Sequence, residues 1–217
     1  MLESPLQFIL DFLFPKGRAE RALEGMTLLD FLSRTEKADV APSFGFSAYL
    51  SYKDPLVKNL IWLIKYHKSR KAFEFGADIF FEELAEETSE GALLQGGARP
   101  LLIPIPMSLK RKRVRGGNHM DRLAQAIVER GGKNFFELDI ESLVRTKETP
   151  PQTSIKDRRR RALNIAGVFS VPHPEKITGK TIILIDDVAT TGATLKEARR
   201  VLLEGGAGKV RSIALAH

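Results

Sequence analysis

Two adjacent carboxylates, Asp186 and Asp187, follow a short apolar run and precede a turn that is rich in hydroxyl groups. The run, Ile182 to Ile185, is apolar at every position, which is typical of a central parallel strand buried on both faces. We expect both acids to emerge at the carboxyl end of this strand, the edge at which open α/β sheets bind ligands. Carboxylates at that edge are placed to accept hydrogen bonds from a diol.

The turn after the two acids offers hydroxyl and backbone N–H groups at the start of an expected helix, Leu195 to about Glu204. The residues that supply them are Thr190, Thr191, Gly192 and Thr194. A phosphate at this position would meet both a nest of donors and the positive end of a helix. The alternative is that the acids cap the strand and the turn satisfies its own backbone, as such residues often do.

From Gly179 to Thr194 the chain resembles the phosphoribosyl pyrophosphate (PRPP) signature of type I phosphoribosyltransferases, because the apolar run, the paired acids and the Thr-Thr-Gly-x-Thr turn occur in order. The resemblance implies that Asp186 and Asp187 hold the ribose 2′- and 3′-hydroxyls. It implies that the 5′-phosphate is held by Ala189, Thr190, Thr191, Gly192, Ala193 and Thr194. Mg²⁺ is expected to bind together with PRPP, since it prefers phosphate and hydroxyl oxygens and needs few protein ligands.

The chain is basic, with 34 Lys+Arg against 27 Asp+Glu and a formal net charge of +7. Much of the excess lies in two runs, residues 110–115 and 156–161. Basic runs are usually solvated faces. Two runs that flank one candidate phosphate site would also attract a polyanion, either PRPP or a nucleic-acid backbone.

The residue types that are missing exclude several functions. The sequence contains no cysteine, which excludes disulfides, cysteine-zinc sites and thiol catalysis. Its four histidines show no metal-ligand spacing, so no zinc is expected. The apolar stretch Leu6 to Phe14 is interrupted and too short to span a bilayer, and no leader frames it. We therefore expect a cytoplasmic protein without membrane insertion.

The expected fold is α/β, a parallel sheet covered by helices, with a small helical lead-in over residues 1–43 and a main domain over residues 44–217. Strand character occurs at 44–52, 100–105, 138–144, 167–171, 181–185 and 210–215, and helical spacing at 6–13, 19–32, 55–66, 72–86 and 118–130. Asp54 and Asn118 are expected N-caps, and Gly131 a left-handed cap. Alternating strands and helices argue for a parallel sheet with both faces covered.

Three further segments resemble the ComF/GntX family, which is described broadly as amidophosphoribosyltransferases and is linked to competence for DNA uptake. They are Leu102 to Pro106 with Arg115-Gly116-Gly117-Asn118, then Gln152, and then Arg161 with Asn164 to Phe169. The resemblance covers roughly Phe44 to His217. It assigns catalytic roles to Arg115, Gln152 and Arg161, and site roles to Lys65, Asn118 and Asn164. Two alternatives stay open: Lys65 can snorkel over apolar neighbours at a helix end, and Asn118 can act as a structural N-cap.

Two segments are placed to close the site. The residues after the Pro104 strand lie beside the same sheet edge, so Ser108, Lys110 and Arg111 are expected to meet the pyrophosphate half of PRPP; the alternative is a basic surface loop. Residues 145–164 show almost no apolar periodicity and are expected to form a loop. In type I phosphoribosyltransferases a hood at this position closes over the substrates, which excludes water and neutralises the departing pyrophosphate.

One departure from the family concerns the start of the chain. ComF-like proteins commonly begin with a four-cysteine zinc finger, and the lead-in here contains no cysteine. The partner or nucleic-acid contact of that finger is therefore in doubt for this chain.

The sequence supports two functional hypotheses. The first is a PRPP-binding phosphoribosyltransferase that works by positioning and electrostatics, with an acceptor that the sequence does not identify. No residue stands out as a general base for that acceptor. The second is a non-catalytic PRPP sensor or DNA-uptake adaptor that binds single-stranded DNA or competence proteins. The basic runs permit DNA binding, although they lack the interleaved aromatic residues on which bases usually stack.

Overall fold

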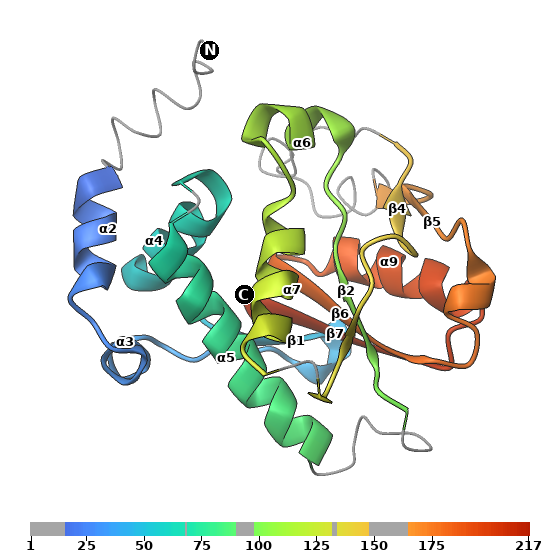
Figure 1. The fold of residues 1–217 in the computed structure, drawn as a ribbon, viewed down its shortest axis with the longest axis horizontal. Coiled ribbons are helices and arrows are strands. Elements are labelled where there is room, and N and C mark those ends of the chain that lie inside the picture. The colour runs from blue at the N-terminus through green and yellow to red at the C-terminus, as the bar shows by residue number, and fades with distance from the viewer. Residues whose placement is uncertain (1–15, 68, 90–97, 132–133, 148–164) are drawn as a thin grey trace.

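Five parallel strands form the central sheet of the computed structural model, which describes residues 16–67, 69–89, 98–131, 134–147 and 165–217. In the order in which they pair, the strands are β1 (Ser47–Leu50), β7 (Lys209–Ala216), β6 (Thr181–Val188), β2 (Leu101–Pro104) and β3 (Glu137–Leu138) (Figure 1). Every pairing in this sheet is parallel, and β6 lies at its centre. The predicted parallel α/β sheet is confirmed.

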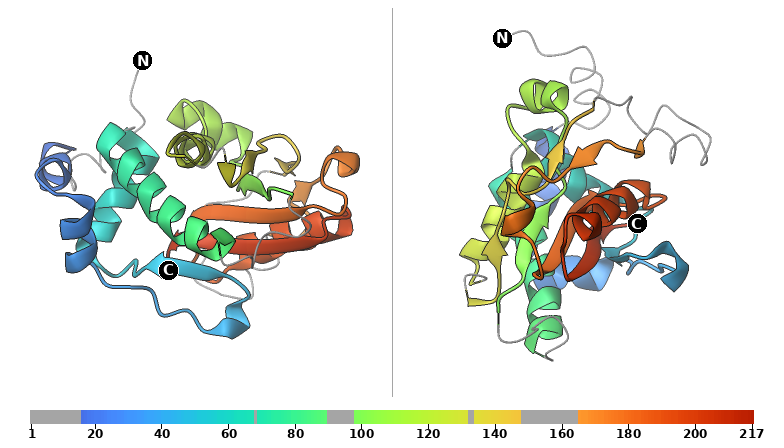
Figure 2. Two further views of the ribbon diagram at one scale, coloured as in Figure 1. Left: turned by 60° about the horizontal axis from the view of Figure 1, so that its bottom comes forward. Right: turned by 90° about the vertical axis from the view of Figure 1, so that its right-hand side faces the viewer.

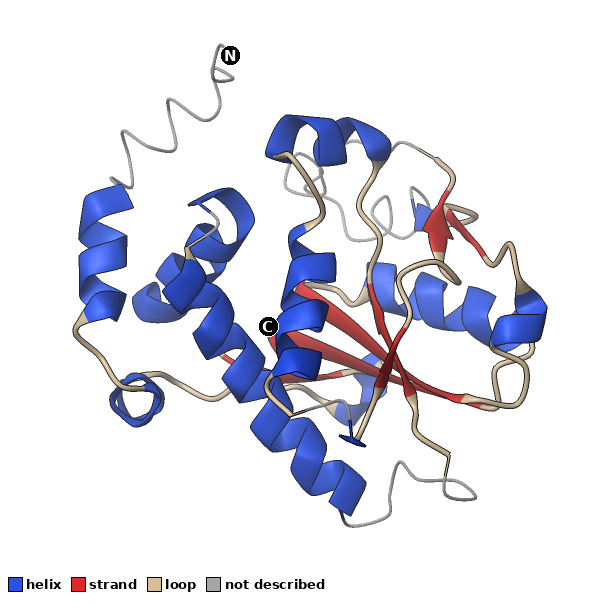
Figure 3. Ribbon diagram, in the orientation of Figure 1, coloured by secondary structure: helices blue, strands red, loops and turns tan. Residues whose placement is uncertain are grey.

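Helices cover both faces of the sheet (Figure 2, Figure 3). One face carries α4 (Pro55–Trp62), the π-helix η2 (Leu63–His67), α5 (Arg70–Ser89) and α7 (His119–Glu129), and the other carries α9 (Ala193–Glu204). Alternate residues of β6 enter the two cores. Ile183 and Ile185 pack with the first group of helices, whereas Ile182 and Leu184 pack with α9. Burial on both faces explains the uninterrupted apolar run.

The β6 strand is longer than predicted. Its apolar part ends at Ile185 as expected, but β6 continues to pair with β7 as far as Val188, which lies opposite Ala216. The two acids therefore lie within the last residues of the strand. Helix α9 likewise begins at Ala193, two residues earlier than predicted. Both differences shorten the turn between strand and helix.

Most helix boundaries agree with the sequence prediction. Asp54 caps α4 by accepting from the backbone N–H groups of Leu56 and Val57, and Asn118 caps α7 by accepting from Met120. The helix predicted to run from residue 55 to residue 66 changes to π geometry from Leu63 onward. Extra residues in a π-turn re-aim side chains, and such turns are frequent at functional sites.

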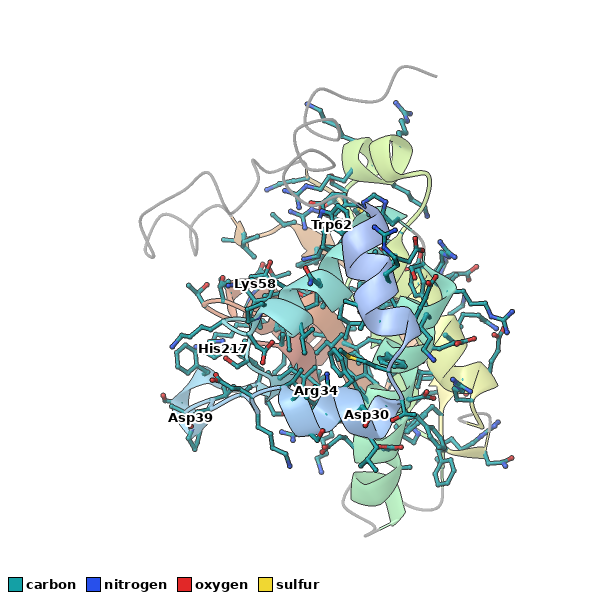
Figure 4. The ribbon with its side chains drawn as sticks, turned by 90° about the vertical axis from the view of Figure 1, so that its left-hand side faces the viewer. Asp30, Arg34, Asp39, Lys58, Trp62 and His217 are labelled. Carbon is teal, nitrogen blue, oxygen red and sulfur yellow. The ribbon has the colours of Figure 1, made fainter. Side chains whose placement is uncertain are left out.

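The lead-in forms two described helices, α2 (Lys16–Glu24) and α3 (Leu28–Arg34), instead of one over residues 19–32. A capping box between Thr27 and Asp30 starts the second helix and so separates it from the first. Leu23 and Phe31 are buried in the same core as α4 and α5. Helix α2 lies beside α4, whose Trp62 is labelled in Figure 4. The predicted helix over residues 6–13 lies outside the described residues, and the domain boundary at residue 43 stays a prediction.

Two predicted strands were wrong in extent. Residues 138–144 do not form one strand, because the Asp139 side chain accepts from the backbone N–H groups of Glu141 and Ser142 and turns the chain. The chain then forms β4 (Val144–Arg145), which pairs antiparallel with β5 (Phe169–Ser170) in a separate two-stranded sheet. The strand predicted at 167–171 is thus outside the main sheet. Shorter 3-10 turns occupy Pro42–Phe44 and Pro174–Lys176.

Candidate functional site

The two acids of β6 enter different surroundings. Side chains alternate along a strand, so Asp187 lies on the face of Ile183 and Ile185, and Asp186 on the opposite face. Asp187 is 6% exposed, whereas Asp186 is half-buried. The described contact of the Asp186 carboxylate is a hydrogen bond of 2.9 Å from the backbone N–H of Asp187.

Lys65 forms an ion pair with Asp187, with 2.8 Å between Nζ and Oδ1. The lysine comes from the π-helix η2 and its side chain is 20% exposed, so it points into the site instead of snorkelling to solvent. Burial works to lower the pKa of Lys65, but the charge of Asp187 outweighs burial and raises that pKa above its ordinary value. Lys65 is therefore a permanent cation at the carboxyl end of β6.

His119 contacts the other oxygen of Asp187 through Nε2. His119 was not predicted as a site residue, because it is 68 residues from Asp187 in the sequence and the histidines were considered only as metal ligands. A better signal was its place as the first residue of α7, directly after the Asn118 cap. We call Lys65, Asp187 and His119 the Asp187 cluster.

The surroundings of the two acids move their pKa values in opposite directions. Burial, followed by the charge of Asp187, raises the pKa of Asp186 to about 8. Burial also opposes ionisation of Asp187, but Lys65 and then His119 outweigh it and keep the pKa of Asp187 below its ordinary value. At neutral pH Asp187 is thus ionised and Asp186 is mostly protonated.

The hydroxyl-rich turn, residues 189–194, is fixed between β6 and α9. Ala189 N–H donates to Ala216 (3.0 Å), and the Ala189 carbonyl accepts from His217 Nδ1 at 2.6 Å. Thr191 Oγ1 accepts from the backbone N–H of Ala193 at 3.4 Å. Thr190 is exposed and Thr191 half-buried, so the turn presents hydroxyl groups at the surface.

Glycine is required at position 192 for two reasons. Its φ of 68° lies in the left-handed region that favours glycine. A Cβ at this position would also overlap the buried ring of Phe46. Gly192 is the N-cap of α9 and makes no side-chain cap, whereas Thr27, Asp54, Ser108 and Asn118 each cap a helix with a side-chain oxygen.

The basic segment after β2 is a helix and not the loop of the sequence interpretation. Helix α6 (Leu109–Arg115) is capped by Ser108, whose buried hydroxyl accepts from the backbone N–H of Arg111 at 3.5 Å. Lys110 is exposed and Arg111 is half-buried. The Ser108 hydroxyl is therefore engaged by its own helix, because a serine before a basic helix is a good cap.

Asn118 contacts the protein through each end of its amide group. Its Oδ1 accepts from Met120 N–H at 3.1 Å, and its Nδ2 donates to the Ile105 carbonyl at 3.4 Å and to Asp121 at 2.5 Å. These bonds tie the start of α7 to the end of β2. The expected N-cap role is confirmed, and the binding role stays a prediction.

The structure describes the remaining predicted residues only in part or not at all. Arg115 is the last residue of α6, and nothing is described of its side chain. Gln152, Arg161 and Asn164, with most of the predicted hood, lie outside the described residues. Within the described ranges, no three or more His, Asp or Glu side chains gather closely enough to hold a metal ion.

Comparison with known proteins shows what the chain is similar to. The model of the phosphoribosyl transferase domain matches residues 122–217. The DNA utilization protein YhgH of Escherichia coli O157:H7 is 32% identical over 110 residues, which cover 51% of this chain and 46% of that protein. The competence protein ComFC of Bacillus subtilis (strain 168) is 31% identical over 154 residues, covering 70% of this chain and 59% of that protein.

A ribose-phosphate pyrophosphokinase of Sulfurisphaera tokodaii is 26% identical over 174 residues, covering 75% of this chain and 58% of that protein. Among solved structures, the adenine phosphoribosyltransferase of Leishmania tarentolae is 14% identical, with a TM-score of 0.41 over 89% of this chain and 88% of that chain. The chain spans about half the length of the curated relatives it matches.

The matched domain and the parallel sheet covered by helices define the class as a phosphoribosyltransferase-like fold. Within that class, the relatives support a phosphoribosyltransferase-like protein of the ComF type. Among the described residues, no helix is long and apolar enough to cross a membrane.

Proposed function

We propose that the protein binds PRPP together with Mg²⁺ and transfers its phosphoribosyl group to an acceptor. The observation that carries this proposal is the order of three features along the chain at the end of β6. A half-buried carboxyl group at Asp186 is followed within a few residues by the hydroxyl-rich turn and by a helix whose N-cap is a glycine. On one ribose, the diol would meet the carboxyl group, and the 5′-phosphate would meet the turn and the start of the helix.

The turn suits the 5′-phosphate for electrostatic reasons. Helix α9 has 12 residues, and the backbone N–H groups of its first turn carry partial positive charge. Gly192 adds no side-chain cap to those groups, and the described hydrogen bond of Ala193 N–H, to Thr191 Oγ1, is long at 3.4 Å, so an anion can compete for it. Thr190 and Thr191 supply hydroxyl donors on the same turn.

Asp186 is the acid better placed to meet the ribose. It is more exposed than Asp187, and the described ion pair of Lys65 and the described hydrogen bond of His119 are made to Asp187 and not to Asp186. Catalysis at such a site consists of orienting the sugar and stabilising charge on the leaving pyrophosphate. By resemblance, Arg115, Gln152 and Arg161 act on that leaving group.

The donor set fits Mg²⁺ that is carried mainly by the ligand. Mg²⁺ keeps several waters and binds through one or two carboxylates plus phosphate oxygens. Asp186 can supply one such carboxylate when it is ionised. When bound, Mg²⁺ would neutralise negative charge on the pyrophosphate.

Thermal unfolding tests the proposal directly. A ligand that binds the folded state at 100 times its Kd stabilises it by about 2.7 kcal/mol. We expect PRPP with Mg²⁺ to raise the melting temperature clearly, and an equimolar mixture of ribose 5-phosphate and inorganic pyrophosphate to raise it less. ATP with Mg²⁺ serves as a polyanion control. No shift with saturating PRPP would contradict the proposal.

A second candidate function is binding of single-stranded DNA. Helix α6 presents Lys110, Lys112 and Arg113 at the surface, and two relatives carry names that refer to DNA utilization and competence. Fluorescence anisotropy with labelled oligonucleotides at 50 and 200 mM salt tests it, because binding through phosphates weakens steeply with salt. DNA binding without any PRPP response would favour the adaptor function over the transferase.

A further inference from the structure

His119 is engaged through one ring nitrogen and has no described partner for the other. Its Nε2 contacts Asp187 Oδ2, whereas Nδ1 is buried without a hydrogen-bond partner among the residues that the structure describes. The side chain is 9% exposed. Most buried polar atoms in folded proteins are hydrogen-bonded, so an exception at a candidate site points to a further partner.

Asp187 determines which ring nitrogen of His119 carries a proton. Lys65 Nζ forms an ion pair of 2.8 Å with Asp187 Oδ1, as expected for an ionised carboxylate. An ionised carboxylate accepts hydrogen bonds and cannot donate them, so the shared proton belongs to Nε2. In the neutral imidazole, Nδ1 then has a free lone pair and acts as an acceptor.

His119 lies between the carboxyl ends of β2 and β6. It is the first residue of α7, and the preceding Asn118 donates to the carbonyl of Ile105, just after β2. Ile105 N–H donates in turn to the carbonyl of Ile185 in β6 at 2.9 Å. The Nδ1 acceptor is therefore near the sheet edge at which α/β folds bind ligands.

Asp187 is less suited than His119 to hold a ligand hydroxyl. Both of its carboxylate oxygens are already engaged, one by Lys65 at 2.8 Å and the other by His119. A sugar hydroxyl that reached Asp187 would compete with a buried ion pair, whereas Nδ1 of His119 displaces no described protein partner.

We propose that His119 Nδ1 accepts a hydrogen bond from a ribose hydroxyl of bound PRPP, and that Asp187 is a positioning residue that fixes the orientation and tautomer of His119. The proposal rests on the proposed function, since the hydroxyl belongs to the proposed ligand. The ribose hydroxyl supplies the donor that Nδ1 lacks among the described residues.

Titration calorimetry on His119→Gln tests this assignment. Glutamine keeps an N–H donor for Asp187 but removes the ring acceptor. We expect ribose 5-phosphate and PRPP to bind about tenfold more weakly, as expected when one hydrogen bond is lost, and inorganic pyrophosphate to bind unchanged. His173→Gln is the matched control, because His173 is an exposed histidine whose described ion-pair partner is Glu175, and all three affinities should stay the same.

Nitrogen-15 spectra of the imidazole rings give a second readout that needs no mutation. We expect His119 Nδ1 to resonate as an unprotonated nitrogen in the free protein, to shift when ribose 5-phosphate is added, and not to shift with inorganic pyrophosphate. A protonated Nδ1 that responds to pyrophosphate would overturn the proposal in favour of an anion donor.

The remaining outcomes separate this proposal from the proposed function. If wild type binds PRPP and folded His119→Gln binds it equally well, Nδ1 is satisfied by water or by the rest of the chain, and the His119 assignment is wrong. If wild type binds none of the three compounds, the proposed function itself is wrong. Should His119→Gln fail to fold, the wild-type spectra decide.

Discussion

Asp186 and Asp187 are neighbours in the chain but lie on opposite faces of the sheet, and the two faces treat a carboxyl group differently. On the face of α4 and α7, Asp187 is buried between Lys65 and His119. On the face of α9, Asp186 is half-buried, and its described hydrogen bond comes from the backbone. Asp187 is thus paired with a lysine and a histidine of the protein, whereas the described hydrogen bond of Asp186 comes from the backbone alone.

The difference shows that a paired-acid motif does not assign one role to both of its members. Alternation along β6 forces the two side chains apart, and what each meets depends on the helices packed over that face. A lysine and a histidine stabilise the ionised form of Asp187. At Asp186, burial and the charge of Asp187 outweigh the charges of Lys65 and Arg145 and raise the pKa to about 8. Substitutions at the two positions should therefore have different consequences.

The largest effect is expected on the Asp187 face. Asp187→Ala leaves Lys65 buried without its partner, and breaking a buried ion pair in this way costs about 3–5 kcal/mol. Urea unfolding measures the loss, with Asp186→Ala as the matched control, for which we expect a much smaller change. The double variant Lys65→Met with Asp187→Leu should recover most of the stability, because apolar replacement of a buried pair is often neutral. Equal losses in the two alanine variants would remove the distinction between the faces.

A smaller effect is expected on the Asp186 face, where Gly192 packs against Phe46. Gly192→Ala should destabilise the protein by about 1–3 kcal/mol more than Gly179→Ala, because overpacking adds to the cost of a left-handed residue. Gly179 is a close control: its φ is 72°, against 68° for Gly192, and a Cβ there meets nothing within 4 Å. Urea unfolding of both variants measures this difference in stability. Equal costs would show that the ring of Phe46 moves aside freely.

The smallest effect is a difference in pH dependence. The pKa of Asp186 is raised in the folded state from its ordinary 3.8 to about 8, so the folded state binds a proton that the unfolded state releases. The stability that this proton contributes is fully present below pH 3.8, the ordinary pKa, and is lost as pH rises to about 8, the pKa in the folded state. Unfolding of wild type and Asp186→Asn at pH 5 to 9 measures it. We expect the stability of the variant relative to wild type to rise across this window, and a constant difference would argue against the raised pKa.

Local signals in the sequence predicted the elements that hold the site. The run Ile182 to Ile185 indicated a strand buried on both faces, and Asp54 and Asn118 indicated helix starts, because caps and periodicity are properties of neighbouring residues. The same reasoning failed at residues 138–144, where apolar residues suggested a strand. Asp139 forms a turn there with Glu141 and Ser142.

The partners within the site could not be predicted in this way. Lys65, His119 and Asp187 come from η2, α7 and β6, and their contact depends on how those elements pack on one face of the sheet. The sequence indicated that Gly192 permits a positive φ but gave no sign of Phe46 beside it. Periodicity identifies which face of an element is buried and leaves open what it is buried against.

Titration calorimetry of PRPP with Mg²⁺ into Asp186→Asn, beside wild type and at pH 9, where the Asp186 carboxyl group is mostly ionised, tests the central claim most directly. Loss of one charge-assisted hydrogen bond, about 1.5–3 kcal/mol, should weaken binding by roughly ten- to a hundredfold. Circular dichroism should show that Asp186→Asn is folded, and urea unfolding should show that it is at least as stable as wild type at pH 8. An unchanged affinity for PRPP in that folded variant would contradict the assignment of Asp186 to the ligand.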